Sequence, residues 1–273
     1  MSKSPAHFSG SGYWALILGG SSGIGLATAH KLATEGMNLL ILHRDRRKDL
    51  PQVESQFEAM RRQGVKCLSL NLDALAPATI DQALELLRAE MAAGDRVRLL
   101  LHAIAKGNLK PLAPLPGNPD EAPLLGRTDF LLTVEAMAVS LADWVQALFA
   151  AGLFAADARV IGLTSEGNQK AWRSYAAVSV AKAALEALCR SIALEYAPYG
   201  IRCNVMQAGI TDTPSLRMIP GSETLLQHAA RRNPFGRTTR PEDVANVVYL
   251  LCRDEAAWIN GALIPADGGE KNQ

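Results

Sequence analysis

The sequence predicts an α/β fold, a doubly wound parallel sheet in a single domain that spans residues 1–273. Short apolar runs alternate with stretches of helical length along the whole chain, which is the pattern of parallel strands joined by crossover helices. A glycine-rich turn follows the first apolar run, at residues 19–25. The length suits one such domain, and the sequence shows neither a repeat nor a second domain.

The composition narrows the functional classes. A formal net charge of +1 argues against binding nucleic acid or a membrane surface by bulk electrostatics. The cysteines are far apart and read as buried free thiols in a reducing compartment, not as a metal site: Cys67, Cys189, Cys203 and Cys252. Residues 1–12 look flexible and unlike a signal peptide, and we expect no segment long enough to span a bilayer. A cytoplasmic location follows.

The first predicted strand, residues 13–18, leads into a glycine-rich turn, and a helix follows at residues 26–35. Glycines let the backbone approach a pyrophosphate, and a helix N-terminus presents unpaired N–H groups to it. Between strand and helix, this turn favours dinucleotide binding over a plain turn. The expected cofactor contacts are Gly19, Ser21, Ser22, Gly23, Ile24 and Gly25.

The residues after the second predicted strand, at 38–42, indicate which dinucleotide binds. A carboxylate at this strand end would hold a ribose 2′-hydroxyl, whereas arginine suits a 2′-phosphate. His43 and Arg44 come first, and Asp45 is one place late among cations. We therefore expect NADP(H), with Arg44 as the main contact. The other basic residues of this loop could instead form a solvated surface without a role in binding: Arg46, Arg47 and Lys48.

The remaining elements continue the alternation. Further strands are expected at residues 65–70, 97–101, 159–163, 201–206 and 261–265, and helices at 53–63, 80–93, 129–149, 174–190 and 240–251. Residues 107–126 are rich in proline and glycine and predict a long loop that borders a site. Residues 211–232 look polar and mobile.

Candidate site residues follow several strands. In a doubly wound sheet, ligands bind beyond the carboxyl ends of the strands, where the sequence places Gly19, Arg44, Asp73, His102, Ser165 and Gly209. Asp73 could accept from an adenine amino group or cap the helix that begins near Pro77. His102 reads more readily as a packed residue than as an acid or base. Trp172 could line a substrate pocket or pack, and packing is favoured.

Tyr175 and Lys182 lie seven positions apart in a run of good helix formers. At about 100° per residue, seven steps return to nearly the same helix face. A buried ammonium there can lower the pKa of a phenol and stabilise an oxyanion.

These motifs together resemble the short-chain dehydrogenase/reductase family over nearly the whole chain. The matching residues are Gly19-Gly20-Ser-Ser-Gly23-Ile-Gly25, Asp73, Ser165, Lys182, Ile201-Arg-Cys-Asn204-Val, Ala208-Gly209 and Asp267-Gly268-Gly269. The main branch of that family has tyrosine four residues before the lysine, where this chain has Val178. Three features resemble the divergent branch of the family, the enoyl-[acyl-carrier-protein] reductases. They are Tyr175, seven residues before the lysine, the segment that starts at His102, and Ala208-Gly209.

The resemblance implies an activity and roles for residues. The intact glycine loop is similar to that of the NADPH-using, type III enoyl reductases. Tyr175 would donate to an enolate oxygen, Lys182 would hold the nicotinamide ribose, and Ser165 would be a second donor. The resemblance also assigns cofactor contacts to His102, Ala103, Thr211 and Thr213, and makes residues 211–232 a lid over the acyl chain. The substrate would be a small or carrier-protein-bound acyl thioester, and the assembly a tetramer or dimer.

Two alternatives stay open. Many enoyl reductases have a second tyrosine where this chain has Ser165, which coincides with the main branch's catalytic serine. A reductase of another activated C=C bond or of a ketone, in secondary metabolism, is therefore the second hypothesis. A cofactor-binding regulatory protein without turnover is the third, and it would need no pairing of Tyr175 with Lys182.

Overall fold

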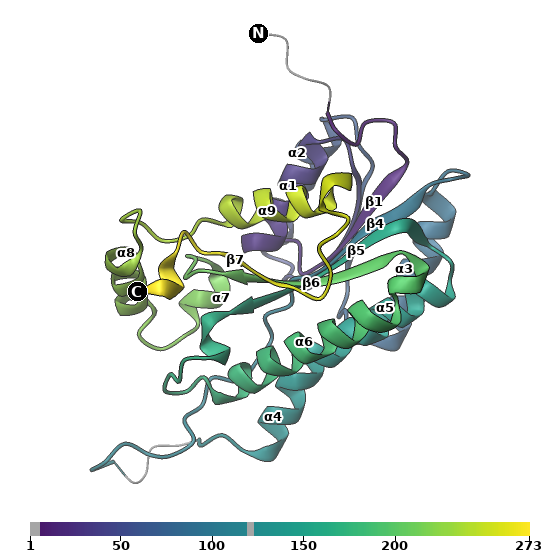
Figure 1. Ribbon diagram of the computed structural model, residues 1–273. Coiled ribbons are helices and arrows are strands. Elements are labelled where there is room, and N and C mark those ends of the chain that lie inside the picture. Colours follow the sequence, from purple (N-terminus) through teal and green to yellow (C-terminus); the bar gives the residue numbers. More distant parts are fainter. Residues whose placement is uncertain (1–5, 119–122) are drawn as a thin grey trace.

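The computed structural model describes residues 6–118 and 123–273 and confirms the predicted doubly wound parallel sheet (Figure 1). Within these residues, seven strands lie in the order β3-β2-β1-β4-β5-β6-β7, and every pair is parallel. The strands are β1 (Tyr13–Leu18), β2 (Asn38–His43), β3 (Cys67–Asn71), β4 (Arg96–His102), β5 (Phe154–Ser165), β6 (Ile201–Ala208) and β7 (Leu263–Ala266). The order reverses between β1 and β4, which creates a crevice at the carboxyl edge there.

Helices cover both faces of the sheet (Figure 1). One layer consists of α1 (Gly23–Thr34), α2 (Leu50–Arg61) and α9 (Pro241–Cys252). The other consists of α3 (Pro77–Glu90), α5 (Ser140–Ala150) and α6 (Ala176–Glu195). The short helix α4 (Arg127–Val134) precedes α5, and α7 (Pro214–Arg217) and α8 (Ser222–Arg232) follow β6.

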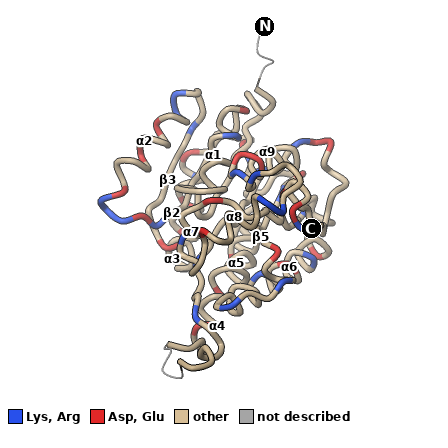
Figure 2. Tube along the Cα trace, turned by 90° about the vertical axis from the view of Figure 1, so that its left-hand side faces the viewer, with Lys and Arg blue, Asp and Glu red and all other residues tan. Residues whose placement is uncertain are grey.

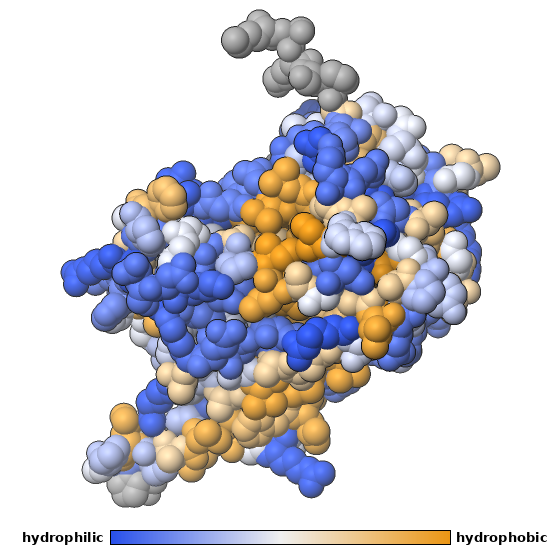
Figure 3. Space-filling view, viewed as in Figure 1, coloured by the Kyte–Doolittle hydropathy of each residue, from blue (hydrophilic) through white to orange (hydrophobic). Residues whose placement is uncertain are grey.

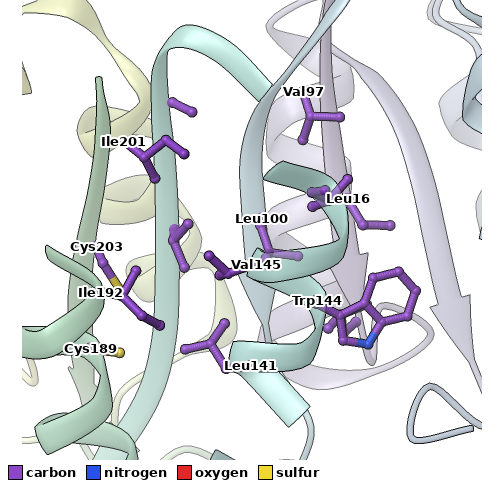
Figure 4. Packing of buried hydrophobic residues seen from close by; sticks show 14 of the residues in the cluster. Leu16, Val97, Leu100, Leu141, Trp144, Val145, Cys189, Ile192, Ile201 and Cys203 are labelled. Carbon is purple, nitrogen blue, oxygen red and sulfur yellow. The ribbon is translucent and has the colours of Figure 1, made fainter. Parts of the chain in front are cut away.

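The central strands are apolar on both sides because both faces are covered. In β1, Leu16 packs with the α5 layer, whereas Ile17 packs with the α1 layer. Figure 4 shows Trp144 and Val145 of α5 pointing toward the strands beside Leu16. This two-sided burial explains why the strands read as continuous apolar runs and not as alternating ones.

Residues 6–12 contact the rest of the fold, whereas residues 1–5 lie outside the described residues. The expected flexibility of residues 1–12 stays a prediction. Phe8 is buried in the α1 layer, and its backbone N–H donates to the Glu35 carbonyl over 2.7 Å. One aromatic side chain docks the segment.

The predicted helix at 129–149 is interrupted. A π-helical turn, Glu135–Val139, separates α4 from α5. By length and composition alone, Arg127–Ala150 could cross a membrane, so the expectation that no segment is long enough is wrong. Half of its most apolar window is buried within this fold, as in the core helix of a globular domain.

Two buried arginines lie in strands that read as apolar. Arg98 in β4 and Arg159 in β5 are almost fully buried and both bind Asp157. Arg98 Nε also donates to the Cys252 carbonyl over 2.9 Å, and Arg159 Nε donates to Leu251 over 2.8 Å. These carbonyls belong to the C-terminal turn of α9 and have no partner within the helix. The arginines therefore tie α9 to the sheet.

The turn before β6 generates a stability prediction. Gly200 has φ +77°, and a Cβ there would lie 1.8 Å from the Ala156 carbonyl oxygen. Gly152 has a similar φ of +67° but faces open space. We expect Gly200→Ala to lower the free energy of unfolding by about 2 kcal/mol more than Gly152→Ala, because the clash adds to the left-handed strain that both share. Urea denaturation measures the difference, and equal losses would contradict this reading of the turn.

Candidate active site

The candidate residues meet at the carboxyl edge of the sheet. Gly19 follows β1, and Arg44 follows β2, which pairs with β1 as far as Leu18 and Leu42. On the other side of β1, Leu18 is level with His102, the last residue of β4. Ser165 ends β5 level with Ala208 of β6. The structure thus brings together the strand ends that the sequence singled out.

The glycine loop forms a cradle that side chains would fill. Gly19 has φ +85°, and a Cβ there would lie 2.7 Å from the Ala103 carbonyl oxygen. A Cβ on Gly25 would lie 2.2 Å from the carbonyl oxygen of Gly19. Ser22, the N-cap of α1, makes no side-chain capping bond, so its hydroxyl leaves the first N–H groups of the helix for another acceptor. This is the arrangement that binds a pyrophosphate.

A cavity of about 200 Å³ opens beside this cradle. Its lining includes Gly19, Ser21, Ser22, Arg44, Asp73 and Ala103. Other expected contacts have different neighbours: Ile24 packs toward the α1 layer, and Thr211 Oγ1 donates to the Gly209 carbonyl over 2.8 Å. Thr213 lies against the loop, because a Cβ on Gly23 would meet its Cγ2 at 3.1 Å. The donors fit the pyrophosphate of a dinucleotide.

The outer end of this cavity carries charge, and Figure 2 shows Lys and Arg gathered between β2 and α2. Arg44 Nη1 lies 2.7 Å from Asp73 Oδ2, and Lys106 Nζ lies 3.4 Å from the same oxygen. Partial burial alone would raise the pKa of Asp73, but a hydrogen bond from Leu75 and these two cations hold it below its usual value. Asp45 is turned away and binds His43 Nδ1 over 2.8 Å.

Of the two sequence interpretations of Asp73, the helix cap is wrong and the adenine contact stays a prediction. The N-cap of α3 is Ala76, so Asp73 does not cap that helix. Its Oδ1 accepts from the Leu75 N–H over 3.1 Å within the preceding turn. Its Oδ2 is held by Arg44 across the cavity rim. Arg46, Arg47 and Lys48 are exposed, as the alternative of a solvated loop predicted.

Tyr175 is the N-cap of α6, directly after Ser174, whose φ of +62° turns the chain into the helix. The Tyr175 hydroxyl lies 3.2 Å from Ser165 Oγ at the end of β5. Gly167 permits this approach, because a Cβ there would lie 2.4 Å from the tyrosine ring. The phenol and the serine hydroxyl therefore form one polar centre.

Lys182 is on the buried face of α6. Its Nζ donates to the Leu163 carbonyl over 2.8 Å, two residues before Ser165. Burial lowers the pKa of the ammonium to about 8, and Cys189 and Glu186 oppose that shift. The bond docks the helix onto β5 and leaves donors of the ammonium for another acceptor.

The expected effect of Lys182 on Tyr175 is wrong for this structure. The pKa of Tyr175 is raised, because burial disfavours the phenolate more strongly than the hydrogen bond with Ser165 favours it. Lys182 directs its observed bond to Leu163. Tyr175 is therefore a protonated donor at neutral pH.

His102 is packed, as the sequence favoured. Its Nε2 lies 2.8 Å from Ser140 Oγ, and Ser140 itself donates to the Ala136 carbonyl. The serine has one proton, so Nε2 must be the donor and Nδ1 the unprotonated nitrogen. Burial, followed by the charge of Lys182, lowers the pKa of His102 to about 3. The ring is neutral and its Nε2 donates to Ser140 of α5.

A larger cavity, of about 660 Å³, lies between the loop after Ser165 and helix α8. Trp172, Ile210, Ile219 and Leu225 supply apolar walls, and Glu166 and Arg232 supply a charged one. The Trp172 and Tyr175 rings are 5.2 Å apart, so Trp172 both packs and lines the cavity. Residues 211–232, which the sequence predicts to be polar and mobile, contain α7 and α8.

Two parts of the site were missed by sequence reasoning. Met137, in the π-helical turn, packs in the same small cluster as Tyr175 and Val178. The ion cluster of Glu166 with Arg232 was also missed. The first had no signal, because the turn is composed of ordinary helix formers; the second joins residues far apart in the chain.

The chain matches a known protein family and is similar to several known proteins. A family model described as enoyl-(acyl carrier protein) reductase matches residues 19–271. A cis-4-hydroxycyclohexanecarboxylate dehydrogenase of Sinomonas cyclohexanicum is 30% identical over 256 residues, which cover 93% of this chain and 95% of that protein. The NADH-dependent enoyl-[acyl-carrier-protein] reductase of Aquifex aeolicus is 34% identical over 110 residues, 40% of this chain and 41% of that one.

Solved structures share the fold. The enoyl-(acyl-carrier-protein) reductase of Anaplasma phagocytophilum, determined with NAD, superposes with a TM-score of 0.79. The alignment covers 100% of this chain and 96% of that one at 18% sequence identity. At this identity the likeness shows the architecture alone.

Proposed function

This chain belongs to the short-chain dehydrogenase/reductase family and is an oxidoreductase of its enoyl reductase-like group, and we propose that it reduces the C=C bond of a trans-2-enoyl thioester with NADPH. The coarser properties, an oxidoreductase that uses a nicotinamide cofactor, follow from the family. The substrate, the preference for NADPH and the roles of individual residues are the proposal.

The placement of Tyr175 is the observation on which the proposal mainly depends. Val178, where the main branch of the family has its tyrosine, is buried in an apolar cluster and offers no hydroxyl. Tyr175, seven residues before Lys182, supplies the hydroxyl next to Ser165. That spacing resembles the enoyl reductases, and it supports a donor placed for a thioester oxygen.

The bound nicotinamide would supply a hydride to the substrate β-carbon. Negative charge then appears on the thioester oxygen, and Tyr175 donates a hydrogen bond or proton to that enolate. Ser165 is the second donor, 3.2 Å from the phenol oxygen. Lys182 would hold the nicotinamide ribose and add positive charge. Donors fixed in advance at a developing oxyanion require no reorganisation during the reaction.

Arg44 supports the choice of NADPH. It lies at the end of β2 beside the cofactor cavity, where the 2′-position of the ribose is read. Asp45, the acid that would favour NADH, is engaged by His43. The larger cavity would hold the acyl group, with α7 and α8 as its lid.

A ketone reductase is the second candidate function. Ser165 beside a tyrosine supports it, because a hydroxyl pair can equally polarise a carbonyl. The Sinomonas cyclohexanicum relative, which covers 93% of this chain, is named as a cis-4-hydroxycyclohexanecarboxylate dehydrogenase. Comparing 3-oxoacyl with enoyl thioesters separates the two candidates.

We further propose a homo-oligomer, a dimer or tetramer. Apolar side chains gather around α9 and β7 and again over α4 and α6 in Figure 3. Trp258 is 97% exposed, Leu194 is 78% exposed and Leu131 is 59% exposed. Large exposed apolar groups of this kind are typical of surfaces that contact another chain.

The first prediction concerns the cofactor. With crotonyl-coenzyme A, we expect faster turnover with NADPH than with NADH. Arg44→Ala should raise KM for NADPH by about 10- to 100-fold, the equivalent of a charge-assisted hydrogen bond, and leave KM for NADH almost unchanged. Arg46→Ala removes the same charge outside the cavity and is the matched control. Turnover with NADH alone would contradict the assignment of NADPH.

The second prediction concerns the hydroxyl pair. Tyr175→Phe should lower kcat by about 10²–10³, because it removes a donor to the oxyanion. Ser165→Ala should lower kcat by about tenfold, the effect of one neutral hydrogen bond. Circular dichroism and NADPH binding serve as controls for folding. An unchanged kcat in Tyr175→Phe would favour a protein without turnover.

The third prediction concerns pH. Because burial sets the pKa of Lys182 at about 8, the ammonium is present below that pH and is lost above it. We expect kcat/KM to fall as pH rises through about 8. Lys182→Arg stays protonated throughout this range, so its lower activity should lack the break. A wild-type profile that stays flat well above pH 8 would disprove the role of the ammonium.

A further inference from the structure

The segment after β7 returns to the active-site side of the molecule. In Figure 1 the C-terminal end lies against α8. In the sequence, this end is far from the loop that follows Ser165. Glu270, in a 3-10 turn at Glu270–Asn272, is 1% exposed. A carboxylate so deeply buried needs partners of opposite charge or hydrogen-bond donors.

Glu270 finds these partners on two other elements. Arg232 Nη2, from the last residue of α8, lies 2.6 Å from Glu270 Oε1 and also binds Glu166 Oε1. The Ile210 N–H donates to Glu270 Oε2 over 3.1 Å. Lys170 Nζ lies 3.0 Å from Glu166 Oε2 and balances the second carboxylate. One guanidinium thus joins the segment after β7 to the residue that follows Ser165.

The surroundings are shaped for this carboxylate. A Cβ on Gly209 would lie 2.7 Å from Glu270 Oε2, so glycine leaves the room that Glu270 occupies. Burial raises the pKa of Glu270, and the hydrogen bond and charge of Arg232 oppose that shift. Removing one member of a buried ionic cluster leaves the others uncompensated.

Helix α8 is held by this ionic cluster at its C-terminal end and by a small apolar contact. Among its eleven residues, Ala229 alone is buried. The helix is amphipathic, and Leu226 packs against the small apolar cluster of Ile210, Leu216 and Ala229. Its other side chains are partly or fully exposed. Directly after it, Asn233 Nδ2 donates to the Asp267 carbonyl over 2.8 Å, again to the segment after β7.

We propose that Glu270 is a positioning residue that holds α8 closed, through Arg232, over the 660 Å³ cavity beside Tyr175. The ionic contact itself needs no substrate or cofactor. Its consequence for catalysis rests on the proposed function, in which this cavity holds the acyl group. Without the carboxylate, the C-terminal end of α8 loses one of the two anions that hold it and opens more often.

Hydrogen–deuterium exchange of the unliganded protein tests the proposal. In Glu270→Ala we expect amides of residues 222–232 to exchange about tenfold faster or more, the effect of losing a charge-assisted hydrogen bond. Amides of β1 and β4 should be unchanged. Lys271→Ala is the matched control, because it alters the next, exposed side chain and should exchange like the wild type.

A second variant covers the case in which Glu270→Ala does not fold. Glu270→Gln keeps the shape and an acceptor oxygen but loses the charge, so we expect a smaller increase, about threefold, in the same amides. Wild-type exchange over residues 222–232 in a folded Glu270 variant would overturn the proposal. With crotonyl-coenzyme A, the variants should raise KM more than they lower kcat. Faster exchange without any enoyl reduction in the wild type would refute the proposed function and leave the positioning role standing.

Discussion

The bond from the Lys182 ammonium to the Leu163 carbonyl is the interaction on which the pairing of Tyr175 with Ser165 depends. It fixes the first turns of α6 against the end of β5. Ser165 is two residues further along that strand, and Tyr175 is at the N-cap of that helix. Their separation of 3.2 Å is therefore set by the docking of a helix on a strand. Side chains on rigid elements hold such distances better than side chains on loops.

The charged side chains of this protein act mainly through local ion pairs and not through an excess of one sign of charge. The net charge is near zero, yet three clusters place cations at defined points: Arg98 with Asp157, Arg44 with Asp73, and Arg232 with Glu270. The first is buried under α9 and holds the fold. The second is exposed at the cavity beside the glycine loop, where solvent weakens it. In the proposed function a cofactor phosphate would compete for this arginine. Burial thus separates structural ion pairs from exchangeable ones.

Much of the fold could be predicted because parallel strands that are covered on both sides appear in the sequence as continuous apolar runs. The glycines that turns with a positive φ require can also be recognised in the sequence. The convergence of Gly19, Arg44 and Ser165 followed from strand ends alone. What could not be predicted depends on contacts between distant residues. Arg98 lies in a strand whose other residues are mostly apolar. It can be buried there because Asp157 and a carbonyl at the end of α9 accept its hydrogen bonds. Phe8 and Glu270 are held by residues far away in the chain, and no local sequence pattern predicts these contacts.

The protonation of Tyr175 connects the geometry to a direction of reaction. Oxidation of an alcohol needs a base, whereas reduction of a C=C or C=O bond needs a donor at the forming oxyanion. Burial raises the pKa of Tyr175 and so keeps the proton on the phenol. The hydroxyl of Ser165 favours negative charge on an oxygen beside it, and in the proposed reaction the ammonium of Lys182 would do the same for the substrate oxygen. In the resting protein the phenol is uncharged, so that stabilisation remains for the substrate. The same electrostatics serve an enolate and an alkoxide, which is why the shape of the cavity under α8, and not the charge of the catalytic centre, must decide between the two substrate classes.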